Sequence, residues 1–367
     1  MSHVLVVRLD NAGDVLLAGP AVRAVAAGAE RVTLMCGPHG AAAGELLPGV
    51  DEVVTWACPW IDPDPDPVER EHVDRFVETV FGLAPDRALV LTSFHQSPLP
   101  TALLLRLAGV PWTGAASTDY PGSLLDLRHR PSDGLHEVER ALSLARVAGY
   151  ELPDGDDGRL AVRPPPKPWL PWASVPWPQR FVVLHPGASV PARAWPEHRW
   201  HELARLLADD GRQVVVTGGP GERALTGRVA AAYGSGGVVD LGGRTSLAEL
   251  AGVLGAASVV VAANTGPAHL AAAVGTPVVS LFAPTVPFER WRPWGVPLVA
   301  LGRGDSPCRD TRVTECPFPG HPCLTSVTAG EVVRAIDSLA PQRRPNHVSP
   351  QPLGDDSLGQ TIPGGMS

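Results

Sequence analysis

The run Asn-Thr-Gly-Pro-Ala-His at residues 264–269 has residue types and a spacing that suit the binding of an anion. It follows a valine-rich run, residues 258–263, that is typical of a buried parallel strand, and it leads into a helix with Pro267 in its first turn. Backbone N–H groups and the positive end of that helix then face the loop, which favours a phosphate. A capped helix without a ligand has the same features, so both interpretations stay open from this turn alone.

Asp14 stands at a second strand-to-helix turn, directly after Gly13. Its carboxylate could project from the turn and act as a general base. The alternative is that Asp14 caps the helix, since aspartate is favoured at the amino end and the helix dipole stabilises its charge. On the acceptor side, further candidates are Asn11, His95, Gln96, His136 and Glu137, for each of which a structural role is the alternative.

Other polar residues follow predicted strands in the second half of the chain. Arg193 offers a planar fork that matches phosphate oxygens, although it could be an ordinary surface cation. The glycine-rich run 217–222 permits close backbone approach to a ligand, and Glu222 could accept hydrogen bonds from a ribose. Four loops, at His185, Thr217, Gly242 and Asn264, are expected at one edge of a single sheet, which is the natural place for a nucleotide.

Two runs of alternating strands and helices must position these residues. Predicted strands lie at residues 3–9, 31–36, 52–56, 88–93, 181–184, 213–217, 238–241, 258–263 and 277–282. Predicted helices lie at residues 15–27, 68–81, 99–108, 135–148, 198–208, 222–233, 247–256 and 329–339, the last of which could fold back toward the first domain. The alternation predicts an α/β protein with two doubly wound domains that face each other across a cleft.

A change of composition places the domain boundary. We predict a first domain at residues 1–160, a proline-rich linker at 161–179, a second domain at 180–340 and a disordered tail at 341–367.

The formal net charge of −8 gives no general basic field for nucleic acid. No uncharged apolar run is long enough to span a membrane and no signal sequence is evident, so we expect a cytoplasmic protein. The spacing of Cys308, Cys316 and Cys323 is not that of a zinc ribbon, and we expect no metal.

Four motifs together resemble glycosyltransferase family nine, the ADP-heptose:lipopolysaccharide heptosyltransferase-like proteins. They are VVRLDNAGDVLLAGPAVRAV, LHPGASVPARAWPEHRW, TGGPGE and NTGPAHLAAAVGTPVVSLF, in that order, and the resemblance covers residues 3–340. It implies a GT-B fold, which consists of two Rossmann-like domains. In that fold the first domain binds mainly the acceptor and the second binds the nucleotide sugar, without a metal or a cofactor.

The resemblance also implies roles for individual residues. Asp14 matches the aspartate that is proposed to deprotonate the acceptor hydroxyl. Arg193 stands where these enzymes usually have a lysine, and Asn264 stands where they often have aspartate, which leaves the donor sugar open because an amide cannot accept a proton at neutral pH. The resemblance implies donor contacts for Glu222, Thr265, Gly266 and His269 as well. Together with the residues that follow the predicted strands, the predicted donor-binding residues are Ser189, Arg193, Thr217, Gly218, Glu222, Asn264, Thr265, Gly266 and His269, and the predicted acceptor-binding residues are Asn11, His95 and Gln96.

The implied function is an inverting, metal-independent transfer of a sugar, expected to be heptose from ADP-heptose, to a hydroxyl of a cell-envelope glycan or a secondary metabolite. The expected partners are a nucleotide-sugar donor and a glycan or small-molecule acceptor, with peripheral contact to a membrane-linked acceptor. We expect a monomer that binds no nucleic acid. Two alternatives remain, a nucleotide-sugar epimerase on a GT-B-like scaffold and a non-catalytic nucleotide-sugar-binding protein. Turnover without an acceptor would favour the epimerase.

Overall fold

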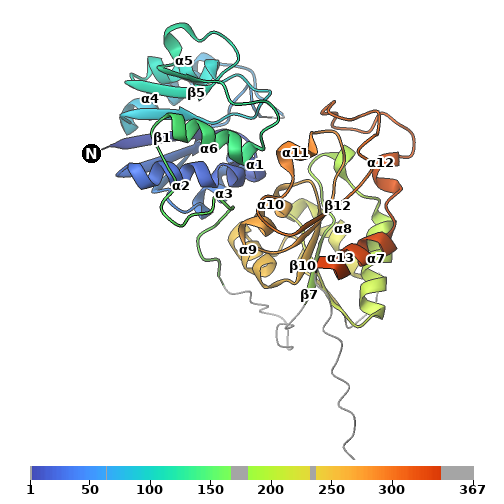
Figure 1. Cartoon of the computed structure of the whole chain (residues 1–367). Coiled ribbons are helices and arrows are strands. Elements are labelled where there is room, and N and C mark those ends of the chain that lie inside the picture. Colours follow the sequence, from blue (N-terminus) through green and yellow to red (C-terminus); the bar gives the residue numbers. More distant parts are fainter. Residues whose placement is uncertain (1, 63, 167–180, 232–236, 340–367) are drawn as a thin grey trace, which may run out of the picture.

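The computed structural model describes residues 2–62, 64–166, 181–231 and 237–339, which form two α/β domains (Figure 1). The N-terminal domain holds one parallel sheet of six strands in the order β3-β2-β1-β4-β5-β6. Its strands are β1 (His3–Arg8), β2 (Arg31–Cys36), β3 (Glu52–Thr55), β4 (Arg87–Val90), β5 (Trp112–Ala116) and β6 (Leu127–His129). Its helices are α1 (Ala12–Leu17), α2 (Gly19–Gly28), α3 (Ala41–Leu46), α4 (Arg70–Leu83), α5 (Leu99–Leu107) and α6 (Glu137–Val147).

The C-terminal domain repeats this topology in a second parallel sheet, ordered β12-β11-β10-β7-β8-β9. Its strands are β7 (Phe181–His185), β8 (Gln213–Val216), β9 (Val238–Asp240), β10 (Val259–Ala263), β11 (Val278–Leu281) and β12 (Leu298–Leu301). Its helices are α7 (Glu197–Asp209), α8 (Arg223–Ala231), α9 (Leu247–Ala256), α10 (Gly266–Ala273), α11 (Phe288–Trp291), α12 (Pro322–Thr325) and α13 (Ala329–Leu339). The prediction of two doubly wound domains is confirmed.

The two strand orders have the same consequence for function. In each sheet the order reverses between two strands, β1 and β4 in the first and β7 and β10 in the second. At such a switch point, the loops that follow the two neighbouring strands run in opposite directions. A crevice therefore forms between them at the carboxyl edge of the sheet. All four central strands are buried valine-rich or leucine-rich segments, as parallel strands covered on both faces require.

Several elements differ from the sequence prediction. The strands β5, β6 and β12 were not predicted, because β5 is rich in small residues, β6 has three residues and β12 is only half-buried. The predicted helix 15–27 is two helices, with Ala18 between them and Pro20 near the start of α2. The last helix does not fold back toward the first domain. Instead, the apolar stripe of α13 packs against α7, β11 and β12 of the second domain.

The two domains meet through helices at the ends of their sheets. Helices α1 and α3 pack against α10 and α9, and one apolar cluster continues from the first domain into the second. Glycines permit the closest approach, because a Cβ atom on Gly13 would lie 3.0 Å from His269 Cδ2 and 3.3 Å from Gly266 Cα. The amino ends of α1 and α10 are therefore side by side at the interface.

The described part of the predicted linker begins on the first domain. The backbone N–H of Arg163 donates to Leu46 O at 2.7 Å, and just before the linker the Arg23 guanidinium binds both carboxylate oxygens of Asp156 at 2.6 and 2.8 Å. The rest of that linker, residues 167–179, and the predicted tail, residues 341–367, lie outside the described residues.

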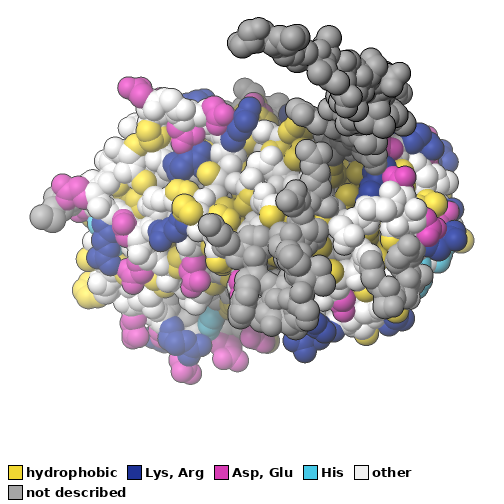
Figure 2. All heavy atoms as spheres, turned by 90° about the horizontal axis from the view of Figure 1, so that it is seen from below, with side chains coloured by type: hydrophobic (Ala, Val, Ile, Leu, Met, Phe, Trp, Pro, Cys, Tyr) yellow, Lys and Arg dark blue, Asp and Glu magenta, His cyan; other side chains and the backbone are white. Residues whose placement is uncertain are grey.

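On the face seen in Figure 2, acidic and basic side chains are interspersed over both domains. Of the helices that the structure describes, none has the length and apolar character to cross a membrane.

Candidate active site

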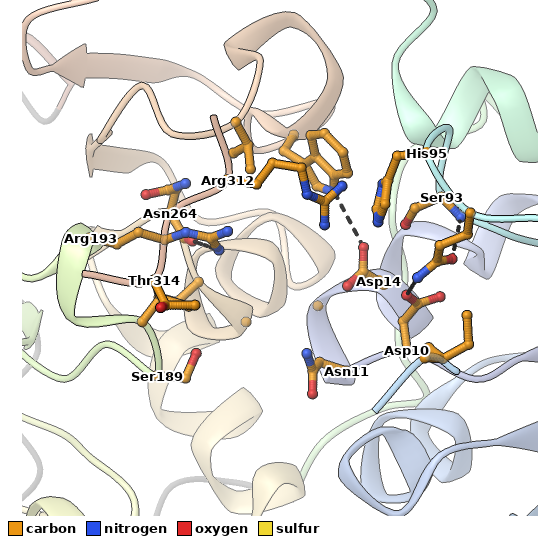
Figure 3. Close-up of a pocket in the computed structure, with 18 of the residues that line it drawn as sticks. Asp10, Asn11, Asp14, Ser93, His95, Ser189, Arg193, Asn264, Arg312 and Thr314 are labelled. Carbon is orange, nitrogen blue, oxygen red and sulfur yellow. Dashed lines mark hydrogen bonds between the residues drawn. The ribbon is translucent and has the colours of Figure 1, made fainter. Parts of the chain in front are cut away.

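A cavity of about 570 Å³ lies between the carboxyl edges of the two sheets (Figure 3). Its walls come from the loops after β1 and β4 in the first domain and from the loops after β7 and β10 in the second. These are the strands that flank the switch point of each sheet. The two crevices that the topology creates therefore open onto one shared cavity, with additional walls from the loops after β3, β11 and β12.

The cavity brings together most of the residues that the sequence singled out. Those that line it are Asn11, Asp14, His95, Gln96, Ser189, Arg193, Asn264, Thr265, Gly266 and His269. Three predicted donor-binding residues, Thr217, Gly218 and Glu222, do not line it. They stand in the loop after β8, at the same sheet edge but one strand further from the switch point.

Asp14 is held by one residue from each domain. Its Oδ1 atom accepts a hydrogen bond from Arg8 at 3.1 Å and another from the indole Nε1 of Trp291 at 3.2 Å. The side chain is 21% exposed, so it still reaches the cavity. Asn11 occupies the N-cap position of α1, and the side chain of Asp14 accepts hydrogen bonds from Arg8 and Trp291 instead of from backbone N–H groups. The capping interpretation of Asp14 is therefore wrong.

Arg8 is a site residue that sequence reasoning missed. It ends β1, is only 3% exposed, and lies 3.0 Å from the Asp10 carboxylate and 3.9 Å from that of Glu137. Its guanidinium also donates to Ser93 Oγ at 2.8 Å. Burial by itself would lower the pKa of Arg8, but the surrounding carboxylates outweigh burial and leave that pKa raised. A charged residue at the end of an apolar strand was the available signal for this network.

The acceptor-side candidates divide into residues open to the cavity and residues engaged within the protein. The Gln96 amide is engaged at both ends, because its Nε2 donates to Asp10 at 2.6 Å and its Oε1 accepts from Ser93 N–H at 2.9 Å. The His95 ring is exposed at the cavity, and partial burial followed by the charge of Arg312 lowers its pKa. His95 is therefore a neutral hydrogen-bonding group at physiological pH.

His136 and Glu137, which were weaker acceptor-side candidates, do not line the cavity. The His136 Nδ1 atom accepts from Val138 N–H, so the neutral ring carries its proton on Nε2 and donates it to Arg292 O at 2.9 Å. Burial lowers the pKa of His136 to about 3, which keeps the ring neutral. Glu137 lies behind Arg8, and burial raises the pKa of its carboxyl. Both residues therefore contact neighbours of the site and do not face the cavity itself.

The C-terminal side of the cavity carries buried polar groups whose hydrogen bonds are incomplete. Asn264 and His269 are each 5% exposed, and within the described residues no partner is found for either amide atom of Asn264 or for His269 Nδ1. The guanidinium of Arg193 donates weakly to Asn264 O at 3.4 Å, while its Nε also lacks a partner among those residues. Burial lowers the pKa of His269 to about 4. Each unpaired buried polar group costs about 1 to 3 kcal/mol, so their gathering at a cavity marks a ligand site.

Positive charge also gathers on this side. Thr265 is the N-cap of α10, and its side chain makes no capping bond to the helix, so the positive end of α10 is open to the cavity. Arg193 flanks that end, and Arg312 and Thr314 approach from the loop after β12. Sequence reasoning missed Arg312 and Thr314 because β12 itself was not predicted. Two arginines and a helix amino end suit a diphosphate.

The loop after β8 is held by its own side chain. Glu222 accepts a hydrogen bond from Gly219 N–H at 2.7 Å, and its carboxylate lies so close to Gly187 that a Cβ atom there would be 1.9 Å from it. His185 Nε2 lies 3.7 Å from the same carboxylate, but burial lowers the pKa of His185, so this contact is not an ion pair at neutral pH. Glu222 thus stands beside the loop after β7 without facing the cavity.

The late cysteines lie in the loop after β12 and in α12. Cys308 and Cys323 are buried, Cys316 is half-buried, and all three are free thiols. Burial raises the pKa of Cys323 to about 11, which keeps that thiol protonated. Over the described ranges, no group of three or more histidine, cysteine, aspartate or glutamate side chains has a geometry that could hold a metal ion.

Two Rossmann-like domains of identical strand order, with one cavity between their switch points, form the GT-B fold that the resemblance implied. The solved structure of the E. coli heptosyltransferase WaaC with ADP shares this fold, with a TM-score of 0.65 at 23% identity over 92% of this chain and 99% of that one. The family model of glycosyltransferase family 9 (heptosyltransferase) matches residues 83–321. The chain belongs to glycosyltransferase family 9.

Two curated relatives are similar over shorter stretches. Lipopolysaccharide heptosyltransferase 1 of Pseudomonas aeruginosa is 37% identical over 141 residues, which are 36% of this chain and 36% of that protein. Lipopolysaccharide heptosyltransferase 1 of Salmonella typhimurium is 32% identical over 172 residues, which are 45% of this chain and 51% of that protein. The chain thus matches from about a third to about half of the length of these relatives.

Proposed function

We propose that the protein transfers a sugar, heptose, from ADP-heptose to a hydroxyl group of a cell-envelope glycan, with inversion at the anomeric carbon. The observation that carries this proposal is the opposition of two kinds of group across one cavity. Asp14 projects from the N-terminal side, while Arg193, Arg312 and the open end of α10 gather on the other. The similar E. coli heptosyltransferase was solved with ADP, and the curated relatives are heptosyltransferases by name, which supports this choice of nucleotide and sugar.

In the proposed step, the acceptor oxygen attacks the anomeric carbon of the donor and its proton passes to Asp14. The bond between that carbon and the diphosphate oxygen breaks, and its electron pair leaves with ADP. A base on one side of the sugar and a leaving group on the other correspond to a single displacement, which inverts the anomeric configuration. The charge that develops on the diphosphate is stabilised by preorganised donors, Arg193 and the amino end of α10.

We further propose that transfer needs no metal ion. Arg193, Arg312 and the α10 amino end supply the positive charge that the leaving diphosphate requires. Asn264, Thr265, Gly266 and His269 are the proposed contacts to the donor phosphates and sugar, and Ser189 lies beside them. The proposed contacts to the ribose are Thr217, Gly218 and Glu222 in the loop after β8. For this contact Glu222 must release the backbone N–H of Gly219. Asn11 and His95 are the proposed acceptor contacts.

The experiment that tests the proposal incubates the protein with ADP-heptose and inner-core lipopolysaccharide oligosaccharides, with and without EDTA. We expect ADP release that depends on the oligosaccharide and is unchanged by EDTA, with the heptosyl product detected by mass spectrometry. The anomeric coupling in its NMR spectrum should show inversion. Release of a free or epimerised sugar at the same rate without any acceptor would support the epimerase alternative. Binding of ADP-heptose without turnover across a wider panel of glycans would support a binding protein.

A further inference from the structure

Residues 288–296 of the C-terminal domain reach across to the N-terminal domain, and we call this segment the clasp. The Trp294 Nε1 atom donates to Gly158 O at 3.0 Å. In the opposite direction, His136 Nε2 donates to Arg292 O at 2.9 Å, and the His136 ring lies 4.5 Å from that of Trp294. The clasp is therefore joined to the first domain by directed hydrogen bonds as well as by ring contacts.

Trp291 is the clasp residue that reaches the proposed base. Its indole Nε1 donates to Asp14 Oδ1 at 3.2 Å, the bond drawn as a dashed line to Asp14 in Figure 3. The Trp291 ring also packs edge-on against Phe94, at 5.6 Å between ring centres, and lies 6.5 Å from the His95 ring. The donor-side domain thus contributes a hydrogen bond to a carboxylate of the acceptor-side domain.

Both hydrogen bonds to Asp14 fall on the same oxygen. Arg8 and Trp291 donate to Oδ1, whereas the described residues make no hydrogen bond to Oδ2. Two donors from different directions fix the rotation of a carboxylate more strongly than one. Oδ2 therefore remains the atom that can receive a proton from a substrate hydroxyl in the cavity.

We propose that Trp291 is a positioning residue that aligns Asp14 only when the two domains are closed, so that domain closure itself assembles the base. This inference rests on the proposed function, because that function makes Asp14 the base. Separation of the domains would break the bonds of the clasp to Gly158, His136 and Asp14 together, and Asp14 would then keep only Arg8. A nucleotide sugar bound to the open protein would then face a misaligned base, which protects the donor from attack by water.

The chain offers a matched pair of variants for the test. Trp291→Phe removes the N–H that reaches Asp14 but keeps a ring against Phe94, whereas Trp294→Phe removes an N–H of the same clasp that reaches only the backbone of Gly158. With ADP-heptose and the oligosaccharide acceptor, we expect Trp291→Phe to lower kcat about 10-fold to 100-fold, and to change KM for ADP-heptose less than about threefold. Trp294→Phe should change both less than about threefold. An equal loss of kcat in both variants, or no loss in Trp291→Phe, would overturn the inference.

A second measurement needs no turnover. The ten tryptophans give indole N–H resonances in protein labelled with ¹⁵N-tryptophan, and the two phenylalanine variants assign those of Trp291 and Trp294. Asp14→Asn should shift the Trp291 indole resonance and leave that of Trp294 in place. An unmoved Trp291 resonance would contradict the inference whatever the protein catalyses. A failure of the proposed function, in contrast, would appear as absent transfer by the wild type while the Trp291 resonance still responds to Asp14→Asn.

Discussion

The two sides of the cavity differ in how their polar groups are satisfied. On the N-terminal side, Asp10 and Asp14 are both bound by Arg8, and further donors reach them from Gln96 and Trp291. On the C-terminal side, Asn264 and His269 are buried with polar atoms that find no partner in the described chain. The first arrangement keeps charged groups in place before a substrate arrives. In the proposed function, the second arrangement gains its missing hydrogen bonds only when the donor binds, so that binding also orders these side chains.

Removal of the proposed base should have the largest effect on the rate. Asp14→Asn keeps the shape of the side chain and loses its capacity to accept a proton, so we expect a loss of about 10²-fold to 10⁴-fold in kcat. Affinity for ADP, measured by calorimetry, should stay within about threefold, because Asp14 lies on the other side of the cavity. Transfer that stays within tenfold of the wild type would exclude Asp14 as the base.

Removal of the cation on the N-terminal side should cost the most stability. Arg8→Met removes the guanidinium from beside the buried carboxylates of Asp10 and Glu137, and breaking such a network typically costs about 3 to 5 kcal/mol. Urea unfolding measures this change in the free energy of unfolding. The matched control is Arg31→Met, since Arg31 forms an exposed ion pair with Glu52 and should change stability by less than about 1 kcal/mol. Similar values for the two variants would show that the Arg8 network is not a buried charge cluster.

A lower pH should destabilise the folded protein through His269, which lies on the C-terminal side of the cavity. Its pKa is about 4 in the folded protein against an ordinary value of 6.5, so the unfolded state binds the proton more readily. Stability is then fully present above pH 6.5 and is lost as the pH falls toward 4, with about 2 kcal/mol from His269 lost between pH 8 and pH 5. His136, which is also buried and neutral, adds a loss of the same sign. The variant His269→Gln should show a smaller decline than the wild type between these pH values, and an identical decline would contradict the burial of a neutral His269.

Removal of the unpaired amide of Asn264 should have the smallest effect on stability. It should raise the free energy of unfolding, whereas Arg8→Met should lower it. Asn264→Leu has a similar volume and no polar atoms, so we expect the free energy of unfolding to rise by about 1 to 2 kcal/mol. Affinity for ADP-heptose should fall in the same variant, because the proposed hydrogen bonds of the amide to the donor are lost. A variant that is less stable than the wild type would show that Asn264 has a structural partner.

The sequence was sufficient to predict the central strands and their loops. The valine-rich runs that form β7 and β10 are buried on both faces, and parallel strands must end at one edge, so Arg193 and Asn264 were correctly expected together. The sequence was not sufficient to predict contacts between residues that lie far apart in the chain. Trp291 and Asp14 are separated by 277 positions and belong to different domains. Nothing local to either residue indicates their hydrogen bond.

Arg312 and Gln96 show two further limits. Arg312 lies in a loop without periodicity, after a half-buried strand that carries little signal, so only the fold brings it to the cavity. Gln96 was expected to contact the acceptor because of its place after a strand, and the fold does place it there. The orientation of its amide toward Asp10 and Ser93, however, depends on the tertiary arrangement of Arg8 and its carboxylates.

The central claim is that the C-terminal side of the cavity binds a nucleoside diphosphate through Arg193, and titration of ADP tests it most directly. At one hundred times its dissociation constant, ADP should raise the free energy of unfolding by about 2.7 kcal/mol, and UDP and GDP should raise it less. Calorimetry should show that Arg193→Ala weakens ADP binding by about 1.5 to 3 kcal/mol, while Arg199→Ala, which removes a half-buried ion pair with Glu202 on α7, leaves it unchanged. Equal ADP affinity in Arg193→Ala and the wild type, or stabilisation by UDP alone, would contradict the account.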